Sequence, residues 1–129
     1  MLVLIVDDDP EDIELLEEAL GEVAGDIECI SARNGEEGMS YLTSARTKPD
    51  YIFSDINMPV LNGKQFLVKL KDHGVLGDIP VIILTTSNAM EDREETKRLG
   101  AAHFITKPPK FTSLVKLISD ILFQNNKTS

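Results

Sequence analysis

Short apolar runs and amphipathic stretches alternate along the whole chain. Residues 2–6 and 81–84 are continuously apolar, which predicts strands that are buried on both faces. The stretches between such runs carry apolar residues at helical spacing, with charged residues on the opposite side. We therefore expect five strands, each followed by a helix, with the strands at residues 2–6, 27–31, 51–54, 81–84 and 102–106.

Capping residues mark the expected starts of several helices. Asp9 followed by Pro10 predicts an N-cap with proline at the first helical position. Asn34 is expected to cap the second helix. Asn88, with Glu91 three residues later, predicts a capping box for the fourth helix.

Five consecutive β-α units predict an α/β fold with an open, parallel, doubly wound sheet. No linker or low-complexity tract interrupts the pattern, so we expect one domain over residues 1–124 and a polar tail at 125–129. A chain of 129 residues can bury about two-thirds of its unfolded surface around a single core.

Charge and composition exclude several classes of partner. The net charge is −9, and residues 1–28 contain no Lys or Arg. Such a chain is repelled by nucleic acid and by anionic lipid. No apolar stretch approaches the roughly 20 residues that span a bilayer. A single cysteine, Cys29, cannot form an internal disulfide, which favours a reducing cytoplasm.

Polar residues follow four of the expected strands. Asp7 and Asp8 follow the first strand, Asp55 the third, Thr85 the fourth and Lys107 the fifth. Ligands of open α/β sheets bind at this edge, near the point where strand order reverses. Carboxylates that meet there repel by about 4 kcal/mol at ~4 Å and an effective dielectric near 20. Either one carboxyl stays protonated or a cation lies among them, and an all-oxygen set favours Mg²⁺.

The same residue types are those that phosphoryl transfer requires. A carboxylate can act as the nucleophile. A metal ion and a lysine can neutralise the phosphoryl oxygens, to which a hydroxyl can donate. The sequence contains no glycine-rich P-loop to hold a nucleotide. The pattern therefore favours a site that receives a phosphoryl group over one that binds ATP.

Over essentially its whole length, the chain resembles the CheY-like receiver domains of two-component response regulators. The matching motifs are Val-Asp-Asp at 6–8, Ser-Asp-Ile-Asn-Met-Pro at 54–59 with Asn-Gly at 62–63, Leu-Thr-Thr at 84–86 and Phe-Ile-Thr-Lys-Pro at 104–108. The resemblance implies a flavodoxin-like (βα)5 three-layer sandwich with strand order 2-1-3-4-5. It also implies phosphorelay signalling, with self-phosphorylation and slow autodephosphorylation, rather than turnover of a substrate. The Thr-Thr-Ser and Lys-Pro-Pro stretches are similar to stand-alone receivers that serve phytochrome-type kinases.

The resemblance also implies a role for each site residue. Asp55 would accept a phosphoryl group from a sensor histidine kinase or a phosphotransfer protein. Asp8 and Asp55 would bind Mg²⁺ through side-chain oxygens and Asn57 through its backbone carbonyl, while Asp7 would act through water. Lys107 would pair with Asp55 and then with its phosphoryl group.

Three further residues belong to the switch that the resemblance implies. Thr85 would move to a phosphoryl oxygen, Phe104 would swing inward behind it, and a cis peptide bond would precede Pro108. The surface of the fourth helix, fifth strand and fifth helix would then change for a downstream protein or a second copy of the chain. Thr86, Pro109 and Phe104 depart from the usual family residues, but none of these departures removes a chemical group from the site.

Two other functions stay open. The chain could be a degenerate receiver that binds partners without phosphorylation. It could also be a phosphohydrolase with an aspartyl nucleophile in the run 7–9, although its length leaves little room for a cap element. Taken singly, Asp7 and Asp8 could cap a helix, Asp55 could be a turn acid, and Lys107 could be a solvated lysine.

Overall fold

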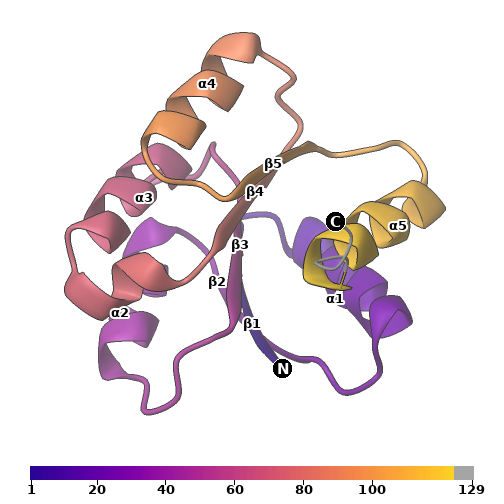
Figure 1. The fold of residues 1–129 in the computed structure, drawn as a ribbon, viewed down its shortest axis with the longest axis horizontal. Coiled ribbons are helices and arrows are strands. Elements are labelled where there is room, and N and C mark those ends of the chain that lie inside the picture. Colours follow the sequence, from indigo (N-terminus) through magenta and orange to yellow (C-terminus); the bar gives the residue numbers. More distant parts are fainter. Residues whose placement is uncertain (124–129) are drawn as a thin grey trace.

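The computed structural model describes residues 1–123, which form a parallel five-stranded sheet between two layers of helices (Figure 1). The expected tail at 125–129 lies outside the described residues. The strands are β1 (Leu2–Val6), β2 (Glu28–Ala32), β3 (Tyr51–Ser54), β4 (Val81–Thr85) and β5 (His103–Thr106). The helices are α1 (Pro10–Val23), α2 (Gly35–Ser44), α3 (Gly63–Lys71), α4 (Met90–Arg98) and α5 (Phe111–Phe123), with a short 3-10 helix η1 (Gly74–Asp78) between α3 and β4.

The sheet order is β2-β1-β3-β4-β5, and every neighbouring pair is parallel. The predicted doubly wound fold with strand order 2-1-3-4-5 is therefore confirmed. Strand order reverses beside β1, because the chain first moves outward to β2 and then crosses to β3. This reversal makes the carboxyl ends of β1 and β3 the expected place for a ligand.

Alternate residues of the strands point to opposite faces, so the sheet separates two apolar cores. Figure 1 shows α1 and α5 on one face and α2 and α3 on the other. One core joins Val3, Ile5, Phe53 and Ile82 to helices α1 and α5. The other core joins strand residues to α2 and α3, and its largest buried members are Leu4, Leu42, Ile52, Phe66, Leu67, Leu70, Leu76 and Ile83.

The expected caps of the first two helices are present. The Asp9 side chain accepts a hydrogen bond from the backbone N of Glu11 at 2.9 Å, and Pro10 occupies the first helical position. Asn34 accepts from the backbone N of Glu37, also at 2.9 Å. Each cap satisfies one of the free N–H groups that a helix start exposes, which is worth about 1 kcal/mol.

The predicted capping box at Asn88 is wrong. Helix α4 starts one residue later than that box requires, and its cap residue, Ala89, has no side-chain bond. Ser87 takes over part of this role, since its Oγ accepts from the backbone N of Ala89 at 3.2 Å and donates to Asp92 Oδ2 at 2.6 Å. Ser87, and not Asn88, therefore hydrogen-bonds to the first turn of α4.

Helix α4 is held to the rest of the fold by few apolar contacts. Its only buried residue is Thr96, whereas α3 buries Phe66, Leu67 and Leu70. Among residues 1–123, no helix is both long and apolar enough to cross a membrane.

Candidate metal and phosphoacceptor site

Three carboxylates meet at the carboxyl ends of the neighbouring strands β1 and β3. Asp7 and Asp8 directly follow β1, and Asp55 directly follows β3. One oxygen of each lies within 4.8 Å of the corresponding oxygens of the other two, and we call these three residues the acidic cluster. The backbone N of Asp55 donates to the carbonyl of Val6 at 3.0 Å, so strand pairing itself sets the position of Asp55 beside β1.

The members of the acidic cluster differ in exposure. Asp7 is buried, Asp8 is exposed and Asp55 is intermediate. Burial raises the pKa of Asp7, and the nearby charge of Asp55 raises it further. The backbone N of Asp9, 3.0 Å from Asp7 Oδ1, and the charge of Lys107 act in the opposite direction. Negative charge is therefore concentrated here at some energetic cost, which a bound cation would relieve.

Lys107 reaches the acidic cluster from the loop after β5, but it lies closest to a residue of α1. Its Nζ is 2.8 Å from Asp12 Oδ2, 3.3 Å from Asp7 Oδ2 and 4.0 Å from Asp55 Oδ2. Burial alone would lower the pKa of Lys107, but the hydrogen bond to Asp12 and the charges of the three carboxylates together raise it. The expected pair with Asp55 is thus present only at the outer limit of an ion pair.

Asp12 is a site residue that the sequence analysis missed. In the sequence it is one of several acids around the start of α1, and such acids are common where a helix begins. Its contact with Lys107 joins residues 95 positions apart. Only the packing of α1 beside the end of β5 reveals it.

The peptide bond between Lys107 and Pro108 is trans, as are all others in residues 1–123, so the expected cis bond is wrong. A trans bond before proline is favoured by about 0.5–1 kcal/mol unless the surroundings demand the cis form. Here Lys107 makes its ion pairs, and its backbone N donates to the Thr85 carbonyl at 2.7 Å, with the bond in the trans form.

Thr85 lies at the end of β4, the neighbour of β3, and is fully buried. Its Oγ1 accepts a hydrogen bond from the backbone N of Ser87 at 3.3 Å. Phe104 on β5 is half-buried, and the guanidinium of Arg93 lies 4.7 Å from the centre of its ring. Cation–π contacts at exposed sites contribute about 0.5–1 kcal/mol. The contact therefore links Phe104 to α4.

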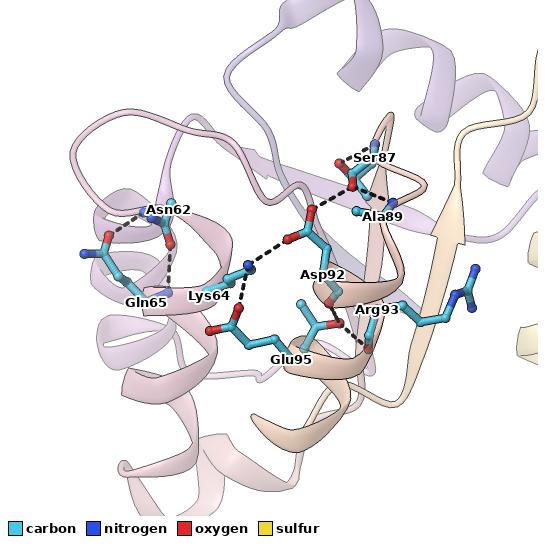
Figure 2. Close-up of polar contacts among 10 residues, drawn as sticks. Asn62, Lys64, Gln65, Ser87, Ala89, Asp92, Arg93 and Glu95 are labelled. Carbon is cyan, nitrogen blue, oxygen red and sulfur yellow. Dashed lines mark hydrogen bonds and ion pairs between the residues drawn. The ribbon is translucent and has the colours of Figure 1, made fainter.

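Figure 2 shows how the loop after β4 is linked to helix α3. Lys64 Nζ lies 2.7 Å from both Asp92 Oδ1 and Glu95 Oε1, and Asp92 accepts from Ser87 Oγ through its second oxygen. These hydrogen bonds raise the pKa of Lys64, and the bonds from Lys64 and Ser87 lower the pKa of Asp92. A continuous hydrogen-bonded path thus runs from Thr85 through Ser87 and Asp92 to Lys64. We call this path the α3–α4 bridge.

Gly63 permits a close approach between α3 and the backbone of Asp55. Its N donates to the carbonyl of Ile56 at 2.8 Å, and a Cβ at this position would collide with the backbone carbonyl of Asp55. Asn62 and Gln65 form a capping box on the same turn (Figure 2). The sequence shows Asn-Gly at 62–63 as one of the family-like motifs, but it did not predict that the glycine supports the site.

The structure thus brings together most of the predicted site residues. Asp7, Asp8 and Asp55 form one cluster, and Lys107 touches it. Asn57 is exposed two residues beyond Asp55. The other predicted residues lie on the neighbouring strands β4 and β5: Thr85 and Phe104. Their proposed roles stay predictions.

Comparison with known proteins gives the family. The model of the response regulator receiver domain matches residues 3–119. The chain is 36% identical over 120 residues to protein PilH of Pseudomonas aeruginosa, a match that covers 93% of the chain and 96% of PilH.

Two solved structures resemble this one closely. One is the phosphorylated cyanobacterial phytochrome response regulator RcpA, with 30% identity and a TM-score of 0.84; the match covers 93% of this chain and 89% of RcpA. The other is the Mn²⁺-bound form of response regulator Rcp1, with 28% identity and a TM-score of 0.83; the match covers 99% of this chain and 96% of Rcp1. The match to the family model over residues 3–119 and the likeness to PilH show that the chain belongs to the response regulator receiver domains and acts in two-component signalling.

Proposed function

We propose that this receiver accepts a phosphoryl group on Asp55 with the help of Mg²⁺. The observation that carries the proposal is the convergence of Asp7, Asp8 and Asp55 within 4.8 Å, with Lys107 at their edge. Asp55 is the member of the cluster that stands at the end of a central strand, between β1 and β4, and its side chain is 14% exposed. It is therefore reachable by a donor and surrounded by the groups that phosphoryl transfer needs.

The acidic cluster fits a hard divalent cation, because its ligands are carboxylate oxygens only. We assign Mg²⁺ to the side chains of Asp8 and Asp55 and the backbone carbonyl of Asn57, with Asp7 acting through water. When bound, the ion supplies positive charge to the phosphoryl oxygens. The Mn²⁺-bound form of Rcp1 supports a divalent ion in a related receiver.

In the proposed reaction, a carboxylate oxygen of Asp55 attacks the phosphorus of a phosphohistidine donor. The P–N bond of the donor breaks, its electron pair stays on the imidazole nitrogen, and an acyl phosphate forms on Asp55. Lys107 neutralises one phosphoryl oxygen, and the Thr85 hydroxyl donates to another after it leaves the backbone N of Ser87. Small phosphodonors such as acetyl phosphate replace the histidine donor, and slow hydrolysis of the acyl phosphate resets the protein.

Phosphorylation would change the surface formed by α4, β5 and α5. Thr85 and Phe104 are the residues that we expect to move, and both are tied to the first half of α4, through Ser87 and through Arg93. The donor would be a sensor histidine kinase or a phosphotransfer protein in the cytoplasm, where the single thiol of Cys29 stays reduced. A downstream protein or a second copy of the chain would bind the altered surface.

The likeness to RcpA, whose structure is that of a phosphorylated phytochrome response regulator, supports both the chemistry and a phytochrome-type kinase as donor. The clustering of Asp7, Asp8 and Asp55, with Lys107 at its edge, supports a phosphorylatable receiver over a degenerate one. No contact in the described residues favours the phosphohydrolase alternative.

Phosphate-affinity gel electrophoresis tests the proposal. We expect the wild-type protein to shift after incubation with acetyl phosphate and Mg²⁺, and the shift to vanish with a chelator or with Asp55→Asn. The matched control is Asp50→Asn, a carboxylate at the opposite end of β3, which should shift like wild type. A shift that persists in Asp55→Asn would assign the phosphoryl group to another residue. An unshifted wild-type protein would favour the degenerate receiver.

A further inference from the structure

Lys107 Nζ donates hydrogen bonds to two carboxylates, that of Asp12 on α1 and, at 3.3 Å, that of Asp7 in the acidic cluster. Its shortest contact is the 2.8 Å bond to Asp12 on α1, and its 4.0 Å distance to Asp55 is too long for a hydrogen bond. The hydrogen bond to Asp12 is also the largest of the effects that raise the pKa of Lys107. The ammonium group that the phosphoryl group needs is thus hydrogen-bonded to Asp12 and Asp7, and not to Asp55, in this structure.

We propose that Asp12 is a positioning residue that competes with Asp55 for Lys107. The proposal rests on the function proposed above. Asp12 holds the ammonium group beside α1 while Asp55 is unphosphorylated. After phosphoryl transfer, the new charge at Asp55 draws Lys107 away from Asp12.

This competition affects Mg²⁺ binding and the phosphorylated state in opposite directions. While Asp12 holds Lys107, the carboxylate of Asp55 is less neutralised by the lysine and is free to attract a divalent cation. The same bond must weaken before Lys107 can pair fully with a phosphoryl oxygen, so it opposes the phosphorylated state. Removing the Asp12 carboxylate should therefore weaken Mg²⁺ binding and strengthen binding of a phosphoryl analogue.

The size of the effect follows from exposure. The side chain of Asp12 is 34% exposed and that of Lys107 is 18% exposed, so solvent screens the pair in part. Partly exposed ion pairs change equilibrium constants by about threefold to fivefold. Asp12 is therefore expected to tune the switch and not to abolish it.

The test compares Asp12→Ala with Glu11→Ala. Glu11 is exposed on the same helical turn, and in residues 1–123 the salt bridges of Lys107 are only to Asp7, Asp12 and Asp55. The control thus removes equal charge from α1 without releasing the lysine. Mg²⁺ affinity is measured by titration of backbone amide shifts, and beryllofluoride affinity by calorimetry at saturating Mg²⁺. Circular dichroism verifies that each variant is folded.

We expect Asp12→Ala to weaken Mg²⁺ binding and to tighten beryllofluoride binding, each by about threefold to fivefold relative to Glu11→Ala. Asp12→Glu keeps the carboxylate and should restore both affinities most of the way. In a Lys107→Met background, Asp12→Ala should change Mg²⁺ affinity no more than Glu11→Ala does, because no lysine remains to be released.

Equal effects of Asp12→Ala and Glu11→Ala in the wild-type background would overturn the competition and leave only a general charge effect. So would an effect of Asp12→Ala that survives Lys107→Met. If the wild-type protein binds neither Mg²⁺ nor beryllofluoride, the proposed function fails together with the role of Asp12. The same titrations therefore separate the two failures.

Discussion

Asp55 is subject to two constraints: its carboxylate lies close to other carboxylates, and its backbone packs closely against Gly63. The carboxylate of Asp55 lies among two others, and its charge is one of the causes that raise the pKa of the buried Asp7. The backbone of Asp55 lies against Gly63, where any side chain would collide. At this scale the site combines an electrostatic cost, which a ligand removes, with a steric requirement, which only glycine meets.

Replacing Asp55 by Asn tests the electrostatic cost. In the presence of a chelator, we expect the free energy of unfolding to stay unchanged or to rise by about 1 kcal/mol, because one repelling charge is lost and Lys107 keeps its bond to Asp12. Urea unfolding followed by circular dichroism measures this difference. A loss of stability of more than about 1 kcal/mol would identify Asp55 as a structural acid.

Gly63→Ala tests the steric requirement. We expect it to destabilise the fold by about 1–3 kcal/mol, since the added methyl group forces α3 away from the backbone of Asp55. Gly21→Ala is the matched control, because its Cβ meets no atom within 4 Å and alanine favours the helix interior of α1 by about 0.5–1 kcal/mol. Equal melting temperatures for the two variants would contradict the close approach at Gly63.

At the scale of elements, α4 differs from the other helices in how it is held. It buries only Thr96, and its remaining described contacts are largely polar: the α3–α4 bridge and the contact of Arg93 with Phe104. A helix docked in this way can shift at low energetic cost, because no apolar core must open. This property suits an element that is expected to move when Thr85 changes partner.

Lys64→Met should loosen α4 without unfolding the protein. We expect the backbone amides of α4 to exchange hydrogen about threefold to fivefold faster. This change corresponds to a loss of about 0.6–1 kcal/mol in the free energy of local opening, because the two ion pairs of Lys64 are partly exposed. Hydrogen exchange followed by mass spectrometry provides the measurement. Lys69→Met on the exposed side of α3 is the control, and similar exchange in both variants would show that the bridge does not hold α4.

The bridge should also depend on pH. Lys64 and Ser87 lower the pKa of Asp92 below its ordinary value of 3.8, so the ionised form is favoured in the folded protein. The stabilisation is therefore complete above the unfolded-state pKa and is lost as the pH falls through the lowered folded-state pKa. Side-chain carbon NMR shifts of Asp92 measure the titration. Lys64→Met should move its midpoint upward, and an unmoved midpoint would exclude the ion pair.

Over the whole molecule, the fold could be predicted because each element buries apolar residues in a regular pattern. The contacts of the site that were not predicted join residues far apart in the sequence. Apolar periodicity indicates strands and helices because each element must bury one or both faces, and all five strands were placed within about one residue of their observed bounds. The 3-10 helix η1 is too short to carry such a period. The contact of Lys107 with Asp12 and the path through Ser87 depend on tertiary packing, which no local pattern encodes. The cis bond before Pro108 came from family resemblance alone, and here the bond is trans.

The net negative charge of the whole molecule means that Mg²⁺ can stabilise the protein in two ways, by general screening and by binding at a specific site. The protein carries a net charge of −9, so any salt that screens repulsion should raise its stability somewhat. A specific site adds a stabilisation that grows with the logarithm of the Mg²⁺ concentration and reaches about 2.7 kcal/mol at 100 times the Kd. At constant ionic strength, we expect Mg²⁺ to raise the melting temperature of wild type but not that of Asp8→Asn.

Asp9→Asn is the control. It removes the same charge from the neighbouring residue and keeps an N-cap for α1, so it should respond like wild type. Equal responses of the two variants in thermal unfolding would mean that Mg²⁺ acts only by screening, and that the acidic cluster holds no metal ion.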